Sequence, residues 1–367
     1  MNIKINISAT LAGLLLTAAL ASSCTKIHTL PDKETQEIAM KCLETKTVLP
    51  DTKANLSDDA SFGVFAYVTE TAGSTPWYEA WPAVADASPY LSNVSFGNID
   101  GSWVGCDFDA GGSKTHHPYY YPLSGSLLFA GYSPHKDQSG GTITSATFHN
   151  NLSDVYNPYL QIKVSQSIVP SAMTDLVYFD LEDVNTGNTV AKSGNAVPVT
   201  FSHAMSMVVF NIKHHYHDVS AHLHECIFNA TFYSGTNPGW LPDTGTGTVK
   251  DMTGLFDGVD QESGGYKQTS ETLYLIPQYT NGHFDVMGSQ IGGDIVLDVT
   301  VTDRIPKTET PDETDYIETS GKVEIKIEDY TPRWEMGKKY TYNITIDKPI
   351  EFGEPVVASV ETLVIEL

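Results

Sequence analysis

Basic residues are scarce in this 367-residue chain. It has 21 lysines and arginines against 45 aspartates and glutamates, which gives a net charge of −24. Only two of the basic residues are arginines, Arg304 and Arg333. Nucleic acid binding needs a basic face that neutralises phosphates, so this composition excludes it. The negative charge suits an exposed surface protein that stays soluble.

Long apolar runs are missing after residue 24. No later stretch approaches the roughly 18 apolar residues of a membrane-spanning helix. Residues 1–23 differ, because they carry one charge, Lys4, and then an apolar run from Ile7 to Ala21 that ends in small residues. Such a short run followed by small residues is typical of a secretory signal peptide. We therefore expect residues 1–23 to be a signal peptide that is removed on export.

The end of this run leads directly into a cysteine. Residues 20–24 read Leu-Ala-Ser-Ser-Cys, which resembles the bacterial lipobox, where a peptidase cuts before the cysteine and its sulfur is lipidated. The segment predicts cleavage between Ser23 and Cys24 and a lipid on Cys24. It departs from the usual pattern at Ala21, where Leu, Val or Ile is common. The alternative is a plain signal peptide with Cys24 present by chance.

Cysteine is also rare, and its spacing supports no metal or redox motif. Besides Cys24 the chain has Cys42, Cys106 and Cys226, which are widely separated and form no C-x-x-C pair. A zinc knuckle or thioredoxin-type site is therefore unsupported. We expect three buried thiols, although one disulfide with one free thiol stays open.

Known catalytic motifs are absent. The sequence has no G-x-S-x-G elbow, H-E-x-x-H helix, P-loop or Rossmann glycine set. Carboxylates are too numerous for an acid–base pair to be singled out. Residues 107–112 (Asp-Phe-Asp-Ala-Gly-Gly) have some features of a calcium loop but lack EF-hand spacing, so an ordinary turn is predicted. We expect neither an enzyme nor a cofactor.

Histidines form the most noticeable polar cluster, between His214 and Glu225. On strands, His222 and His224 share a face, as do His215 and His217, and such pairs can bind zinc or copper. No pattern of Asp or Cys partners completes a site. A hydrophilic hairpin tip between two strands is therefore the favoured interpretation.

Other candidate binding residues have ordinary structural explanations. The pair His116-His117 is a weaker metal candidate. His203 stands alone among apolar residues and is expected to pack with its ring hydrogen-bonded. The aromatic segments Trp77–Trp81 and Tyr119–Tyr121 could form a ligand face, but packing in the core is favoured.

Strand patterns are frequent in the sequence, and helix patterns are not. Twenty-nine glycines and 19 prolines supply turns between short runs of β-branched and aromatic residues. Several runs alternate apolar and polar residues, as expected for antiparallel sheets with one buried face. The expected strands are Ser61–Thr69, Ser126–Ala130, Leu160–Val164, Leu176–Phe179, Val197–Lys213, Cys226–Tyr233, Thr272–Pro277, Asp294–Asp303, Lys322–Glu328, Lys339–Asp347 and Val356–Leu367.

Chain length and turn-rich segments suggest two domains. About 340 mature residues are too many for one β-sandwich and natural for two. The predicted fold class is all-β, with two tandem antiparallel β-sandwich domains at residues 61–195 and 196–367. Residues 24–60 are expected to be a lipid-anchored tether and N-terminal segment. The segment Glu309–Ile317 is expected to be an acidic hairpin loop.

Four segments resemble the fimbrillin family of Bacteroidetes, whose members build surface fimbriae. Phe201–Ile212 is similar to the family's F-x-H-A-x-S-x-V-x-F strand, and Leu273–Gln278 to its apolar strand ending in I-P-Q. Trp334–Ile346 resembles its W-x-x-G-K-x-Y-x-Y-x-I strand, and Met173–Tyr178 a weaker M-x-D-L-x-Y element. The resemblance extends over roughly Ser61–Ile346.

This resemblance implies a structural role on the cell surface. It implies two transthyretin-like sandwiches, export as a lipoprotein of the outer membrane, and polymerisation with other fimbrial subunits by donor strand exchange. In that process a protease removes the N-terminal segment, and a neighbour's strand fills the groove. The best-known members are cut after an arginine before the first core strand, whereas no arginine precedes Arg304 here. Cleavage after Lys46 or Lys53 would be needed, or the segment is retained, as suits an anchor or a tip.

Two segments are candidates for the donated strand. They are Thr45–Leu49 and Ser359–Leu367, although the latter could equally be the last strand of the second domain. The alternative function is that of a monomeric surface lipoprotein that binds a glycan or a host protein.

Overall fold

The computed structural model describes most of the chain beyond residue 36. The described residues are 37–42, 56–69, 89–109, 111–122, 126–149, 159–179, 196–235, 238–256, 260–262, 265–284, 290–306, 316–346 and 359–366. The proposed signal peptide, Ser23, Cys24, Thr45–Leu49 and Trp77–Trp81 lie outside them, so those interpretations stay predictions. No helix in the described part of the chain is both long and apolar enough to cross a bilayer.

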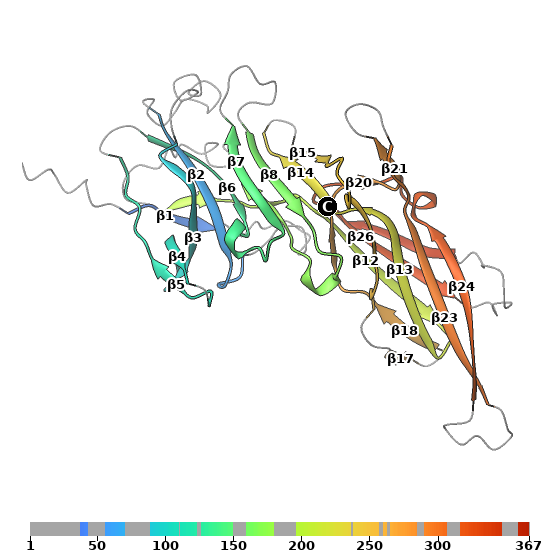
Figure 1. Ribbon diagram of the computed structural model, residues 1–367. Helices are drawn as coiled ribbons and strands as arrows, with labels where there is room; N and C mark the ends of the chain where they lie inside the picture. The colour runs from blue at the N-terminus through green and yellow to red at the C-terminus, as the bar shows by residue number, and fades with distance from the viewer. Residues whose placement is uncertain are drawn as a thin grey trace, which may run out of the picture.

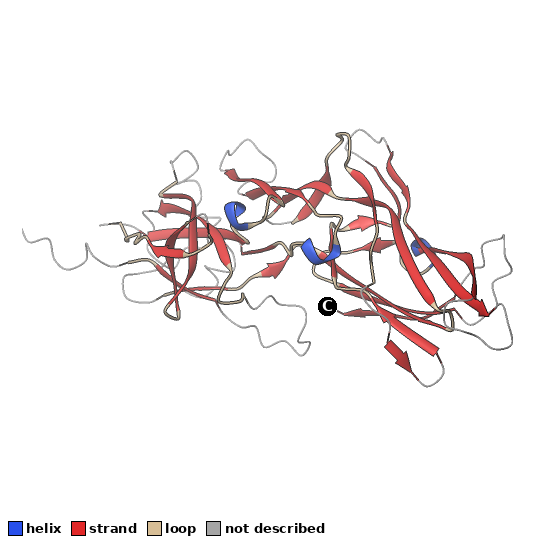
Figure 2. Cartoon of the chain, turned by 60° about the horizontal axis from the view of Figure 1, so that its bottom comes forward, coloured by secondary structure: helices blue, strands red, loops and turns tan. Residues whose placement is uncertain are grey.

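Strands make up nearly all of the regular structure, as Figure 2 shows. The first and largest sheet has nine strands. In order they are β10 (Val197–Val199), β1 (Ala39–Cys42), β4 (Ser102–Phe108), β3 (Leu91–Ile99), β2 (Ser61–Thr69), β6 (Ser126–Ser133), β9 (Val177–Phe179) and β11 (Ser202–His203), with β5 (Lys114–His116) paired to β4.

The two ends of this sheet are neighbours in the chain. β10 ends at Val199 and β11 begins at Ser202, so the ends lie at most about 11 Å apart at full extension. The sheet therefore curls around on itself. Its interior is filled by one cluster with residues from seven of its strands, including Met40, Phe62 and Phe179.

A second sheet covers the other side of β2 and β6. Its order is β15 (Gly239–Pro242), β14 (Asn229–Tyr233), β8 (Tyr159–Ser165) and β7 (Ile143–His149). Val64 of β2 points into the curled sheet, whereas Phe65 packs against this second sheet. The residues of β2 and β6 are therefore buried on both faces.

The third and fourth sheets form a sandwich at the other end of the molecule (Figure 1). The third contains β17 (Asp260–Glu262), β18 (Gly265–Thr269), β12 (Ser206–His214), β26 (Lys339–Ile346) and β27 (Ser359–Glu366) in order, with β19 (Leu273–Leu275) paired to β12. The fourth is β16 (Val249–Met252), β13 (Asp218–Ile227), β23 (Val296–Pro306) and β24 (Tyr316–Lys326).

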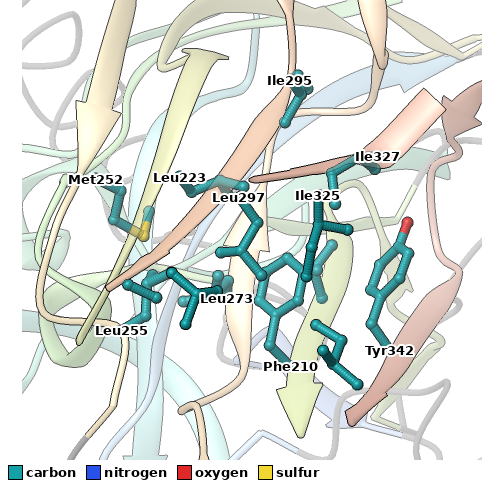
Figure 3. Close-up of a cluster of buried hydrophobic side chains, with 14 of the residues drawn as sticks. Phe210, Leu223, Met252, Leu255, Leu273, Ile295, Leu297, Ile325, Ile327 and Tyr342 are labelled. Carbon is teal, nitrogen blue, oxygen red and sulfur yellow. The ribbon is translucent and has the colours of Figure 1, made fainter. Parts of the chain in front are cut away.

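The core of this sandwich is apolar and aromatic. Figure 3 shows Phe210 and Tyr342 of the third sheet with Leu297 and Ile325 of the fourth. Trp334 is fully buried in the same cluster, and its Nε1 donates a hydrogen bond to the Tyr342 hydroxyl at 2.9 Å. The pairing of its polar atom lets a large aromatic side chain be buried without an unsatisfied donor.

The remaining elements are small. Strand β20 (Gln278–Tyr279) pairs with β25 (Arg333–Trp334), and β21 (Asn281–Phe284) with β22 (Gln290–Asp294). The described helices are the short 3-10 turns η3 (Lys136–Gln138), η4 (Pro170–Ala172) and η5 (Ile327–Asp329). Most pairs among the described strands are antiparallel, and the parallel pairs among them are β1–β10 and β12–β26.

The halves of the chain are joined by shared structure. β14 pairs with β8 along five residues, although β8 precedes and β14 follows the proposed boundary at Asn195. Buried Gln166, after β8, donates its side-chain amide to the carbonyls of Thr174 and Tyr274. The boundary between residues 195 and 196 stays a prediction, but packing and strand pairing cross it.

Candidate functional site

Strand β1 is an internal strand of the curled sheet, between β10 and β4. In the chain, residues 43–55 separate it from the next described segment. It pairs antiparallel with β4, where Met40 faces Trp103. On its other side it pairs parallel with β10, where Met40 faces Val197 and Cys42 faces Val199. Within the described structure β10 pairs with β1 and no other strand. β1 therefore joins β10 to the rest of its sheet.

The side chains of this segment alternate between core and surface. Ile38 is fully buried and Met40 is 3% exposed, and both belong to the core of the curled sheet. Lys41 between Met40 and Cys42 is exposed. Burial raises the pKa of the Cys42 thiol to about 12, so this cysteine is held as an unreactive thiol. We call the space that Ile38 and Met40 occupy, between β4 and β10, the β1 seat.

A short segment, residues 117–121, crosses β4 and holds the start of β1. We call it the strap. Tyr119 accepts a backbone hydrogen bond from Ile38 at 2.7 Å, and Tyr120 forms a β-bridge with Glu37. The strap crosses at Gly105, whose carbonyl accepts from the His117 amide at 2.8 Å. A β-carbon on Gly105 would lie 2.3 Å from the Tyr119 ring, so only glycine allows this crossing.

Ionic and aromatic contacts fix the strap in place. The Glu37 carboxylate pairs with the His116 ring, which links the residue before β1 to the end of β5. The His117 ring pairs with Asp107 at 2.8 Å and stacks on Tyr119 with ring centres 5.0 Å apart. The end of β1 nearer the N-terminus is therefore held by backbone, charge and ring contacts together.

The other terminal strand, β27, lies at the edge of the third sheet. It pairs antiparallel with β26 from Ser359 to Glu366, with one register shift between Asn343 and Ile344 of β26. Among the described strands it has no second neighbour. Residues 359–366, the described part of the segment Ser359–Leu367, therefore extend the third sheet beyond β26, as one of the two sequence interpretations of this segment predicts.

The histidine cluster does not assemble into a metal centre. β12 ends at His214, which is fully buried, and burial lowers the pKa of its ring. His222 and His224 share a face of β13, but the two ring nitrogens of His224 each face a carboxylate, Asp251 and Asp298, at 3.1 Å. No group of three or more His, Cys, Asp or Glu among the described residues is arranged to hold a metal ion.

The other candidate residues have structural roles. His203 pairs with Asp175 at 2.6 Å. The Asp109 carboxylate accepts backbone hydrogen bonds from Gly111 and Ser113, both at 2.8 Å, which closes an ordinary turn and lowers the carboxyl pKa. Cys42, Cys106 and Cys226 are free thiols; Cys106 and Cys226 are buried as expected, whereas Cys42 is only partly buried, because it lies at the end of β1.

The aromatic segment at residues 119–121 is divided between core and surface. Tyr121 is buried in the core of the curled sheet and Tyr119 is packed against it, whereas Tyr120 is 44% exposed. The preference for packing therefore holds for two of the three rings.

Sequence reasoning missed β1 itself, because residues 24–60 were expected to be a tether with an N-terminal segment. The available signal was that the large apolar residues Ile38 and Met40 alternate with other residues between Glu37 and Lys41. This pattern is too short to distinguish a strand from a polar linker. The strap also gave no sequence signal, since Gly105 and Tyr119 meet only in the folded chain.

Comparison with known protein families identifies the family of this chain. A family model described as fimbrillin-like matches residues 45–364. The chain belongs to the fimbrillin-like family. This family is structural and adhesive rather than enzymatic, so the fimbrillin-like chain is a component of a cell-surface fimbria that interacts with other fimbrial subunits. No curated protein matches it in sequence.

Solved structures of similar proteins have low sequence identity to this fimbrillin-like chain. A fimbrial protein from Bacteroides vulgatus is 16% identical, with 90% of this chain and 98% of the other covered and a TM-score of 0.49. A candidate cell adhesion protein from Bacteroides ovatus is 14% identical, with 91% and 96% covered and a TM-score of 0.49. The fimbrial anchor protein Mfa2 from Porphyromonas gingivalis is 9% identical, with 84% and 90% covered and a TM-score of 0.34. The family assignment rests on the match over residues 45–364.

Proposed function

We propose that this protein is a subunit, or an accessory anchor or tip component, of a fimbria that assembles by donor strand exchange at the β1 seat. The observation that carries the proposal is the position of β1. It is a strand of four residues between β4 and β10, and 13 residues, 43–55, separate it from the next described segment. One cut in those 13 residues would leave β1 bound by non-covalent contacts alone.

The energetics favour replacement over an empty seat. Without β1, the backbone groups of β4 and β10 that it pairs would lose their partners, and each lost hydrogen bond costs about 1 kcal/mol net. Exposing Ile38 or Met40 would cost about 1.5–3 kcal/mol each. A strand from a neighbouring subunit that supplies both the pairing and the apolar side chains would restore these contacts.

We take strand β27 as the donor. It is an edge strand, so its departure breaks one ladder, whereas an internal strand would break two. Its sequence, Ser-Val-Glu-Thr-Leu-Val-Ile-Glu, has enough apolar residues to fill the β1 seat. When β27 is donated, it loses its pairing with β26 in its own chain.

Limited proteolysis tests the exchange. A lysine-specific protease that cuts after Lys46 or Lys53 is expected to convert purified monomer into a ladder of SDS-resistant multimers. The matched control is the double variant Lys46→Gln/Lys53→Gln, which should resist the cut within residues 43–55 and stay monomeric. Deletion of residues 359–367 should allow the cut but prevent the ladder. Cleaved wild-type protein that stays monomeric at high concentration would contradict the proposal.

Lipid anchoring at Cys24 is the second part of the proposal. The supporting observation is the lipobox-like segment from Leu20 to Cys24. Mass spectrometry of the protein from its host cells should find an acylated N-terminal Cys24 and place the protein in the outer membrane fraction. The Cys24→Ser variant should lose the lipid and the membrane association. An N-terminus other than Cys24 in the wild type would argue for a plain signal peptide.

A further inference from the structure

The second sheet has an outward face that strand exchange does not use. Its inward residues, such as Leu160, Ile162 and Phe232, fill the core that it shares with β2 and β6. Cross-strand register places the alternate residues on the opposite face. They are Ser145, Thr147 and His149 of β7, Tyr159, Gln161, Lys163 and Ser165 of β8, and Asn229, Thr231 and Tyr233 of β14.

Three rings form a row across this face. His149 stacks on Tyr159, with ring centres 4.6 Å apart and planes within 17°. Tyr159 contacts Tyr233 at 5.6 Å with a 58° tilt. Tyr159, in the middle, is buried, whereas His149 and Tyr233 at the ends are half-buried. The row is a fixed aromatic surface with a partly open ring at each end.

A hydrogen-bonded chain runs beside the rings. The side-chain oxygen of Gln161 lies 3.0 Å from His149 Nε2, and the side-chain nitrogen of Gln161 donates to the Tyr233 hydroxyl at 3.2 Å. Gln161 is thereby held in one orientation. Because the Tyr233 hydroxyl accepts from Gln161, its own proton is directed elsewhere and can be donated to a ligand.

The charge of this face differs from that of the molecule. None of its outward residues on β7, β8 and β14 is a carboxylate, in a chain that has 45 of them, and one outward residue, Lys163, is a lysine. Asp243, just beyond the end of β15, accepts a hydrogen bond from Thr231 at 3.4 Å. The face therefore offers hydroxyl, amide and aromatic groups.

We propose that this face binds a neutral oligosaccharide. The C–H groups on one side of a sugar ring carry partial positive charge and pack on the negative face of an aromatic ring. The sugar hydroxyls both donate and accept hydrogen bonds, which matches the amide of Gln161 and the hydroxyls of Thr147 and Tyr233. The net charge of −24 repels anionic glycans, so a neutral ligand is the better fit.

Direct binding measurements on the whole chain test this site. An array of neutral, sialylated and sulfated oligosaccharides is the first probe, followed by calorimetry with the neutral sugar that gives the strongest signal. Tyr233→Ala and Gln161→Glu are each expected to weaken binding by at least about tenfold, from loss of the ring contact or of the amide donor. Tyr233→Phe, which keeps the ring, should have a smaller effect.

The control is Tyr279→Ala, which removes an exposed tyrosine on β20 and should leave binding unchanged. Circular dichroism and thermal melting of each variant check that the fold is intact. The proposal is wrong if the wild type binds no neutral oligosaccharide at millimolar concentration, prefers acidic glycans or binds only peptides. It is equally wrong if Tyr233→Ala and Gln161→Glu bind as well as the wild type. Strand exchange is independent of every one of these results.

Discussion

The buried ring of His135 illustrates how one side chain makes stability depend on pH. His135 is 5% exposed, and its Nε2 lies 3.2 Å from the Asn93 carbonyl while its Nδ1 accepts from the Asp137 amide. Burial lowers the pKa of the ring, outweighing the opposing effects of the Asn93 contact and of Asp137, while Lys136 nearby lowers it further. The neutral ring, with Nε2–H as donor and Nδ1 as acceptor, satisfies both contacts.

The sign of the pH effect follows from this lowered pKa. Below about pH 6.5 the unfolded chain binds a proton at His135 that the folded chain does not. Stability should therefore fall as pH drops from about 6.5 towards the folded pKa, by up to about 1.4 kcal/mol for each pH unit. Urea unfolding between pH 7 and 5 measures this, and His135→Gln should make the decline shallower but not abolish it, because burial also lowers the ring pKa of His214 and His283. The exposed His222→Gln control should keep the wild-type slope; equal slopes in both variants would refute the assignment.

Sequence reasoning at the residue scale found the role of a side chain only where that role is local. Cys42, Cys106 and Cys226 were expected to be buried thiols; all three are free, but Cys42 is only partly buried. The ordinary turn at residues 107–112 was also expected, since the segment lacks EF-hand spacing, and in the structure Asp109 caps residues only two and four positions away. The partners of His224 could not be found, since Asp251 and Asp298 come from two other strands. Long-range partners of this kind depend on register, which a single sequence does not specify.

At the scale of elements, the strap depends on a single residue, Gly105, for its position. Gly105→Ala would place a β-carbon 2.3 Å from the Tyr119 ring and 2.4 Å from the His117 carbonyl oxygen. The strap must then move, which we expect to cost about 1–3 kcal/mol and to loosen the start of β1. Urea unfolding and the rate of proteolysis within residues 43–55 are the measurements.

The matched control for this prediction is Gly245→Ala. Gly245 has no atom within 4 Å of the added β-carbon, and its backbone is not left-handed. The substitution should therefore change stability by less than about 0.5 kcal/mol. If both variants unfold and are cut alike, the crossing at Gly105 does not hold β1.

Strand prediction succeeded where one pattern dominates a segment. Ser61–Thr69 was predicted with the bounds that β2 has, and Lys339–Asp347 ends one residue beyond β26. The run Val197–Lys213 is divided into β10, β11 and β12, because the chain passes there from the first sheet to the third. The hairpin of β3 and β4 was missed, since its glycines and polar residues resemble a loop until Gly97 and Gly105 are seen to allow close packing.

The candidate site was predictable only in outline. The C-terminal strand was among the predicted strands, and its pairing with β26 agrees with one of its two interpretations. The β1 seat was not predictable, because its walls, β4 and β10, are more than 80 residues apart in the chain. Parallel pairing such as that of β1 with β10 carries no turn signal in the sequence.

Across the whole molecule, the two halves should unfold together. The core between the second sheet and β2 and β6 includes Ala204, Met205 and Ile276 from the second half of the chain. β14 adds five backbone pairs to β8 across the same boundary. Calorimetry should therefore show one transition, with the calorimetric enthalpy equal to the van't Hoff enthalpy.

An isolated fragment of residues 61–195 provides the companion test. It lacks β1, β14 and β15, so we expect it to stay unfolded or to aggregate. Two separate transitions in the whole chain, or a stable folded fragment, would show that the halves are independent domains.

The double burial of β2 and β6 limits where this protein can change. Neighbouring residues such as Val64 and Phe65 face different cores, so a substitution at either position disturbs one core directly and displaces the backbone shared with the other. Related chains are therefore expected to diverge on the outward faces of the peripheral sheets and to keep these two central strands nearly fixed. The molecule can in this way alter its outer surface repeatedly while its interior stays the same.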